Sequence, residues 1–287
     1  MALEITPLHP LFAGEVRELD LRDPLRVEEA REIEQAMDRY AVLVCRNQPL
    51  TEDQQIAFAR NFGSLEAGFA KVKQGGTRLK HAELADISNV ALDGNIAERD
   101  TRKIVGNVAN QLWHSDSSFQ QPAARYSMLS AVVLPGWGGE TEFCDMRAAY
   151  EALPGSLKLE VDELTAEHYA LHSRFLLGDT DYSREQRDLM PPVHWPLVRT
   201  HAGSGRKMLF IGAHASRIVG RSVAEGRMLL ADLLEHATQS QFVYRHEWQV
   251  GDLVMWDNRS TLHRGRRYDL SSRRELRRAT TLDDALV

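Results

Sequence analysis

Residues 126–144 of the chain read YSMLSAVVLPGWGGETEFC, two runs of strand-forming residues separated by a turn. The first run, residues 126–134, is rich in apolar, aromatic and β-branched side chains, which favour strands. Pro135 and three glycines then turn the chain into the second run, residues 140–144. This stretch predicts a β-sheet that is interrupted by a glycine-rich turn.

The segments on either side add further strands and a set of helices. Thr51-Glu52-Asp53-Gln54 has the form of a capping box, so we expect a helix from there to Phe62, with Gly63 ending it. Strands near both chain ends, with helices at the start and in the middle, are typical of antiparallel sheets braced by helices. The sequence therefore predicts a mostly β fold with flanking helices. The expected helices are 24–40, 51–62, 147–153, 157–171 and 223–236, and the further strands are 41–45, 197–199, 209–211 and 275–281.

One long polar segment, around residues 69–100, shows no sustained hydrophobic period and contains one short expected strand near Ile87. Long loops within a domain are often functional, so we expect this segment to act as an active-site lid. No composition shift, repeat or low-complexity tract marks a domain boundary elsewhere. The sequence therefore predicts a single domain over residues 1–287.

Composition restricts the class of protein. Hydrophobic residues make up 43% of the 287 residues and charged residues 26%, which is ordinary for a globular protein. The net charge of −6 disfavours a general nucleic-acid binder, although arginines cluster between Arg264 and Arg278. Cys45 and Cys144 lie within apolar runs, and we read neither an export signal nor a membrane-spanning run. We therefore expect a cytoplasmic protein that binds neither nucleic acid nor membrane.

The strongest local motif is Trp113-His114-Ser115-Asp116. If this segment is a strand, His114 and Asp116 point to the same face and present an imidazole and a carboxylate side by side. His263 lies in the late β region and could supply a third ligand. Two histidines and one carboxylate form the facial triad of non-heme Fe(II) oxygenases, which leaves coordination positions open. A His-x-Asp match alone is weak, because it often arises by chance.

Two further residues strengthen the interpretation of this motif. Arg274 stands eleven residues after His263, and its planar fork is suited to grip a carboxylate of a dicarboxylate cosubstrate. Thr141, in the second strand of the opening stretch, could add a hydroxyl to the same carboxylate.

These residues, at these spacings, resemble the taurine and 2,4-dichlorophenoxyacetate (2,4-D) branch of the Fe(II)/2-oxoglutarate-dependent dioxygenases. The resemblance covers nearly the whole chain, from Leu8-His9-Pro10 to Thr280-Thr281-Leu282. Three segments, 110–126, 141–150 and 256–268, look like the members of this branch that act on 2,4-D. A similarity over nearly the whole chain is far more specific evidence for this family than the two histidines and one carboxylate alone.

The resemblance implies a double-stranded β-helix (jelly-roll) core with His114, Asp116 and His263 as iron ligands. It implies 2-oxoglutarate as cosubstrate, held by Arg274 and Thr141, together with dioxygen, and ascorbate as the reductant used in vitro. Trp248 matches a position lining the same pocket, although it is equally well an ordinary core aromatic. Related halogenases lack the carboxylate ligand, so the presence of Asp116 favours hydroxylation.

For the organic substrate, Arg278 matches the family position that binds its acidic group, and Lys71 resembles a position proposed to help hold an aryloxyacetate. Lys71 is equally well a solvated surface lysine. The expected reaction hydroxylates the methylene beside the ether oxygen of 2,4-D, giving a phenol and glyoxylate together with succinate and CO2. The family commonly forms homo-oligomers, and we expect one here.

Two alternatives remain open at this point. The same mechanism could act on taurine, other sulfonates or other aryloxyalkanoates, because Arg278 could bind any of these anions. A jelly-roll that binds a metal or a small acid without catalysis is the alternative from another class. His214 could approach the pocket, but a lone buried histidine is more often structural, and Ser117 stays undecided.

Overall fold

The computed structural model describes residues 3–67, 77–99 and 101–284. Its strands are β1 (Ile5–Pro7), β2 (Gly14–Val16), β3 (Val42–Cys45), β4 (Leu84–Ser88), β5 (Ala124–Val133), β6 (Thr141–Asp145), β7 (Thr165–His168), β8 (Val193–Pro196), β9 (Val198–Thr200), β10 (Lys207–Leu209), β11 (Ala215–Ile218), β12 (Val243–His246), β13 (Leu253–Asp257), β14 (Thr261–Gly265) and β15 (Glu275–Leu282). Its α-helices are α1 (Val27–Tyr40), α2 (Glu52–Ala59), α3 (Arg102–Ala109), α4 (Met146–Glu151), α5 (Gly155–Val161), α6 (His172–Phe175), α7 (Arg184–Asp188) and α8 (Val223–Ala237), with short 3₁₀ turns η1 (Arg60–Phe62) and η3 (Ser240–Phe242).

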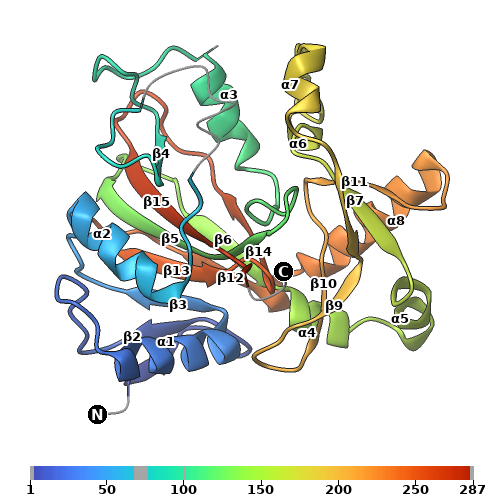
Figure 1. The fold of residues 1–287 in the computed structure, drawn as a ribbon, viewed down its shortest axis with the longest axis horizontal. Coiled ribbons are helices and arrows are strands. Elements are labelled where there is room, and N and C mark those ends of the chain that lie inside the picture. Colours follow the sequence, from blue (N-terminus) through green and yellow to red (C-terminus); the bar gives the residue numbers. More distant parts are fainter. Residues whose placement is uncertain (1–2, 68–76, 100, 285–287) are drawn as a thin grey trace.

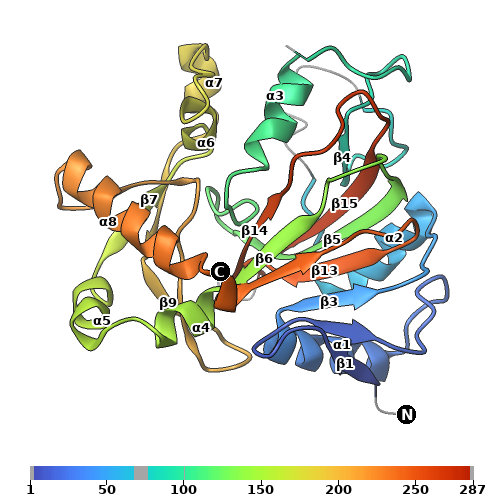
Figure 2. The same ribbon diagram turned by 180° about the vertical axis from the view of Figure 1, so that it is seen from behind.

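Two sheets face one another and form the main body of the molecule (Figures 1 and 2). The larger sheet has seven strands in the order β1-β2-β3-β13-β5-β15-β4, and the smaller has the order β12-β6-β14. All neighbours pair antiparallel except β2 and β3. Phe143 of β6 packs against Leu129 of β5 and Trp256 of β13 in one buried cluster, so a hydrophobic core fills the space between the sheets.

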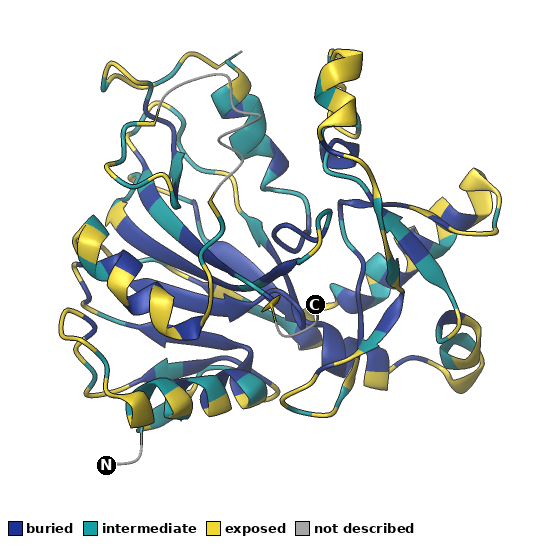
Figure 3. Ribbon diagram, in the orientation of Figure 1, coloured by how far each residue is buried: buried dark blue, intermediate teal, exposed yellow. Residues whose placement is uncertain are grey.

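The opposite face of the larger sheet is covered by α1 and α2. Side chains alternate along each strand, so on β5 Leu129 and Ala131 point to the smaller sheet while Tyr126 and Met128 point to the helices. Met37 of α1 and Ile56 of α2 complete this second cluster. Figure 3 shows the consequence, since both helices bury one side and expose the other.

Residues 146–242 form a second region beside the two sheets (Figure 1). It contains the sheets β11-β7-β8 and β10-β9, with α8 packed against β11. Its buried cluster includes Cys144 of β6 and Leu262 of β14, so its packing is continuous with the smaller sheet. The organisation as a single domain stays a prediction.

The structure confirms most of the expected elements. The helices expected at 24–40 and 223–236 are α1 and α8, and the late strand is β15. The capping box is present, because the Thr51 hydroxyl accepts a hydrogen bond from the Gln54 amide, 3.2 Å away. The hairpin expected between residues 197–199 and 209–211 is present as the β9–β10 pair, with Val198 opposite Leu209, but its second strand covers residues 207–209 rather than 209–211.

One expected helix is wrong over most of its length. The prediction of a helix at 157–171 holds only as far as Val161, where α5 ends, and residues 165–168 form strand β7. Ala166 and His168 alternate as buried residues, and β7 pairs with both β8 and β11. These partners are distant in sequence, so tertiary pairing overrides the local helical pattern.

The segment expected to be a lid is only partly described. Strand β4, which includes Ile87, confirms the short strand expected there, and it pairs with β15. Lys71 and the first part of the segment lie outside the described residues, so a lid function stays a prediction. Within the described part of the chain, no helix is long and apolar enough to cross a membrane.

A buried ion pair connects the second region to the main body. The Arg147 guanidinium and the Asp145 carboxylate are both fully buried and lie 2.9 Å apart. Arg147 also donates hydrogen bonds to the backbone oxygens of Asp38 and Arg39 in α1. Arg206 and Glu151 form a pair at 2.6 Å in which Glu151 is half exposed.

We expect Asp145→Asn to lower the free energy of unfolding by about 3–5 kcal/mol, because it leaves the buried Arg147 without its counter-charge. Glu151→Gln is the matched control and should cost less than about 1 kcal/mol, because water screens its pair. Urea denaturation of both variants measures the difference. Equal losses in the two variants would contradict this account of Arg147.

Candidate active site

The site begins with a two-way backbone contact between His114 and His263. The His114 amide donates to the His263 carbonyl at 3.0 Å, and the His263 amide donates to the His114 carbonyl at 2.8 Å. This isolated bridge joins the segment after α3 to strand β14. The expectation that His263 returns beside the first motif is therefore confirmed.

The expectation that His114 and Asp116 share a strand is wrong. His114 makes only the isolated bridge, and Asp116 begins a turn in which Ser117 has φ of +47°. The Asp116 amide donates to Asn258 Oδ1 at 3.1 Å, which holds the turn in place. The carboxylate reaches the imidazoles through this turn rather than through strand alternation.

The three side chains form one buried cluster of potential metal ligands. One ligand atom from each of His114, Asp116 and His263 can be chosen so that all lie within 4.8 Å of one another. The Asp116 oxygens lie 3.9 Å from His114 Nε2 and 3.8 Å from His263 Nε2. His114 Nδ1 is 2.7 Å from the Leu112 carbonyl, which can only accept, so the proton lies on Nδ1 and the Nε2 lone pair is free.

The charge states of these groups suit a divalent metal ion. Burial lowers the pKa of both His114 and His263, which keeps the imidazoles neutral at neutral pH. Burial would raise the pKa of Asp116, but the charge of Arg278 and the neighbouring His263 and His114 lower it to about 2. Two neutral nitrogens and one carboxylate oxygen form a donor set for a first-row transition metal, so the residues present fit such an ion.

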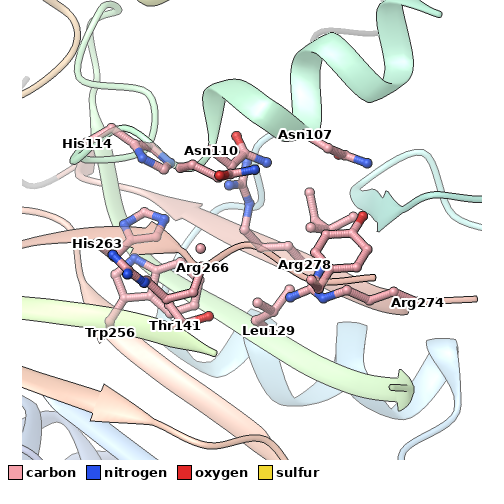
Figure 4. Close-up of a pocket in the computed structure, with 14 residues that line it drawn as sticks. Asn107, Asn110, His114, Leu129, Thr141, Trp256, His263, Arg266, Arg274 and Arg278 are labelled. Atoms are coloured by element: carbon pink, nitrogen blue, oxygen red, sulfur yellow. The ribbon is translucent and has the colours of Figure 1, made fainter. Parts of the chain in front are cut away.

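A pocket opens beside this cluster, and it brings together side chains from β5, β6, β14, β15 and α3 (Figure 4). The expected site residues Thr141, Arg274 and Arg278 all line it, with His114 and His263 at one end. The remaining lining residues are Ile87, Asn107, Asn110, Gln111, Leu129, Trp256, Gly265, Arg266 and Tyr268.

Arg274 is a buried cation without a carboxylate partner among the described residues. Burial lowers its pKa to about 10. Its Nη2 donates to the Gly139 carbonyl at 3.2 Å, its guanidinium lies 5.0 Å from the centre of the Tyr268 ring, and its Nε has no hydrogen-bond partner. A buried guanidinium with an open donor is suited to bind an anion.

Arg278 lies between the pocket and the ligand cluster. Its Nη1 pairs with Asp116 Oδ1, whereas its buried Nε has no hydrogen-bond partner. It stands opposite Leu129 of β5, which also lines the pocket. Arg278 therefore combines contact with the ligand cluster and an open donor for a second anion.

Trp248 contacts Thr141, a residue that lines the pocket. Its indole Nε1–H donates to Thr141 Oγ1 at 3.0 Å, but Trp248 is not among the lining residues. Lys71 lies outside the described residues, so its predicted role is untested. His214 lies with its ring centre 6.3 Å from that of His114, and is likewise absent from the lining.

Sequence reasoning missed two buried residues behind Asp116. Ser127 donates to Asp116 Oδ2 at 2.8 Å, and Asn258 accepts from the Asp116 amide. Asn258 lies in the segment 256–268, whose family resemblance could have indicated a role at the site. Ser127 lies in none of the three resembling segments, so the sequence offered no such indication for it. The lining amides Asn107 and Asn110 of the α3 region were also missed.

The family described as "Taurine catabolism dioxygenase TauD, TfdA family" matches residues 4–280 of the chain. The chain belongs to this dioxygenase family.

Among individual proteins, the chain is 73% identical over 287 residues, all of both chains, to "Alpha-ketoglutarate-dependent 2,4-dichlorophenoxyacetate dioxygenase" of Cupriavidus pinatubonensis. It is 38% identical over 286 residues to "(S)-phenoxypropionate/alpha-ketoglutarate-dioxygenase" of Sphingobium herbicidovorans, covering 95% of this chain and 92% of that one. A solved structure, "Crystal structure of AAD-2 in complex with Mn(II) and N-oxalylglycine", is similar with a TM-score of 0.95 at 50% identity, over 98% of both chains.

We expect His114→Ala to weaken Mn(II) binding by more than about 100-fold, because it removes a direct ligand rather than an outer-shell partner. Titration calorimetry on metal-free protein measures this loss. His194→Ala, at a half-exposed histidine of β8, is the control and should bind Mn(II) as the unmodified chain does. Tight binding of one Mn(II) per chain by His114→Ala would remove His114 from the ligand set.

Proposed function

We propose that this chain uses 2-oxoglutarate and dioxygen to hydroxylate the ether-adjacent methylene of 2,4-D and related phenoxyacetates. One oxygen atom enters the C–H bond, and the other oxidises 2-oxoglutarate to succinate with release of CO2. The hydroxylated product is a hemiacetal, whose C–O bond breaks to give a phenol and glyoxylate. The observation that carries the proposal is one pocket lined by His114 and His263 of the candidate metal-ligand cluster and by two arginines, Arg274 and Arg278, each of which has a buried Nε without a hydrogen-bond partner.

In this proposal His114, Asp116 and His263 hold Fe(II), which supplies the dioxygen chemistry that these side chains lack. Ascorbate would keep the metal reduced in vitro. The donor set and the protonation states described above support this assignment. The Mn(II) in the similar AAD-2 structure adds support from a relative.

Arg274 and Thr141 bind the distal carboxylate of 2-oxoglutarate. Thr141 Oγ1 already accepts the indole hydrogen of Trp248, so its own proton is free to donate to a carboxylate oxygen. Arg274, immediately before β15 of the larger sheet, adds a charge-assisted donor. Trp248 acts in this scheme by orienting the Thr141 hydroxyl.

Arg278 binds the carboxylate of the phenoxyacetate. Its Nη1 pairs with Asp116, but its Nε has no hydrogen-bond partner and the side chain lines the pocket, so the same guanidinium can also bind a substrate anion. Leu129 and Ile87 line the same pocket and offer apolar contacts to an aryl ring. Lys71 stays a prediction as a second contact.

For the fold, we propose a double-stranded β-helix core. Consecutive strands β12, β13, β14 and β15 belong alternately to the smaller and the larger sheet, which is the pattern of a jelly-roll. We also propose a homo-oligomer in a reducing cytoplasm, where the free and buried Cys45 and Cys144 need no disulfide. Light scattering measures the oligomeric state.

The experiment that tests the function is aerobic turnover with Fe(II), ascorbate and 2-oxoglutarate. We expect 2,4-D to yield phenol in step with succinate. Release of sulfite from taurine instead, without phenol from 2,4-D, would keep the reaction class and overturn the substrate. Absence of succinate with every organic acid tested would favour a binding protein.

The two arginines should separate the two organic acids kinetically. Arg274→Ala should raise the KM for 2-oxoglutarate by about 10- to 100-fold, because a charge-assisted hydrogen bond is lost, while the KM for 2,4-D changes little. Arg278→Ala should raise the KM for 2,4-D more than the KM for 2-oxoglutarate. Equal changes in both KM values for either variant would contradict the assigned roles.

A further inference from the structure

Behind Asp116, on the side away from the pocket, lies a closed network of hydrogen bonds. Ser127 of β5 and Asn258, just after β13, are both buried, with at most 1% of their surface exposed. Ser127 stands opposite both Trp256 of β13 and Thr280 of β15. Neither Ser127 nor Asn258 lines the pocket, so neither is placed to contact a substrate.

The direction of each hydrogen bond in this network is fixed by groups that can only donate. The Trp256 indole Nε1–H and the Asp116 amide both point to Asn258 Oδ1, at 3.0 and 3.1 Å. The Asn258 oxygen must therefore face them, which turns its Nδ2 toward Ser127 Oγ at 2.9 Å.

This donation determines where the Ser127 proton lies. Ser127 Oγ accepts from Asn258 and contacts Asp116 Oδ2 at 2.8 Å. The ionised carboxylate can only accept, so Ser127 donates its single proton to Asp116. The Thr280 hydroxyl, 3.2 Å away, then donates to the remaining lone pair of Ser127.

We propose that Ser127 and Asn258 are positioning residues that orient the Asp116 carboxylate for metal binding. Asn258 holds the Asp116 backbone in its turn and, through Ser127, also holds one carboxylate oxygen. Arg278 contacts the other oxygen, so each oxygen has its own partner. Without the Ser127 hydrogen bond, the carboxylate can rotate away from the two imidazoles and must lose rotational freedom when a metal ion binds.

The inference rests on the metal site of the proposed function, and the test separates the two. Ser127→Ala should weaken Mn(II) binding to the metal-free protein by about 10- to 100-fold, the usual effect of removing an outer-shell partner. Ser130→Ala is the control, because Ser130 is a buried serine of the same strand whose side chain points to the helix-covered face. It should bind Mn(II) within about twofold of the unmodified chain.

The outcomes are distinct. If the unmodified chain does not bind Mn(II), the metal site of the proposed function fails. If it binds Mn(II) and Ser127→Ala binds it equally well, only the positioning role fails. Ser127→Ala should have the lower urea midpoint of the two metal-free variants, because it leaves Asn258 Nδ2 without its acceptor, so the Mn(II) affinities are compared in buffer in which both variants are folded.

Asn258→Asp tests the direction of the network. An aspartate still accepts from Trp256 and from the Asp116 amide, but its second oxygen accepts the Ser127 proton and takes it from Asp116. Asn258→Asp should therefore weaken Mn(II) binding as Ser127→Ala does, and the double variant should be no weaker than the weaker single variant. If the losses of Mn(II) affinity in the two single variants multiply in the double variant, the coupling between Asn258 and Ser127 is overturned. If Asn258→Asp does not fold, the comparison of Ser127→Ala with Ser130→Ala tests the proposal.

Discussion

The backbone bridge between His114 and His263 is the constraint on which the site depends. Because His114 and His263 lie directly opposite each other in this isolated bridge, their imidazole rings come within 4.1 Å, centre to centre, although the residues are distant in sequence. Strand β14 is held in turn by β6, with His263 opposite Phe143. Because β6 also carries Thr141, one strand sets the spacing between the candidate metal ligands and the proposed carboxylate site.

Charge explains why the pocket is suited to organic acids. Asp116 supplies one carboxylate, whereas Arg274 and Arg278 supply two buried or half-buried guanidiniums. In the metal-free chain Arg278 neutralises Asp116, and Arg274 has no carboxylate partner among the described residues. A divalent metal ion adds further positive charge, so the complete site is balanced only when anions bind. Two organic acids per turnover satisfy this requirement.

The sequence predicted the parts of the site that carry distinctive chemistry and missed those that depend on distant partners. The three residues of the candidate ligand cluster followed from His114-x-Asp116 and His263, and the helix predicted at 24–40, which is α1, followed from its amphipathic pattern. The turn at Asp116 was missed because Asn258 holds its amide, and the helix expected across β7 was wrong because pairing with β8 and β11 decides that segment. The sequence around Ser127 contains no local pattern that predicts its hydrogen bond to Asp116.

Strand β15 shows why the several parts of this site cannot vary independently. Residues that alternate on its inner face include Arg278, which lines the pocket, and Thr280, which contacts Ser127. Arg274 enters the pocket immediately before the same strand. A shift of register by one residue would turn both inner-face side chains toward α1 and α2, and remove the proposed substrate contact and the contact with Ser127 together. The pairing of β15 with β5, in which Arg278 stands opposite Leu129 and Thr280 opposite Ser127, is therefore what keeps the proposed anion sites aligned with the candidate metal ligands.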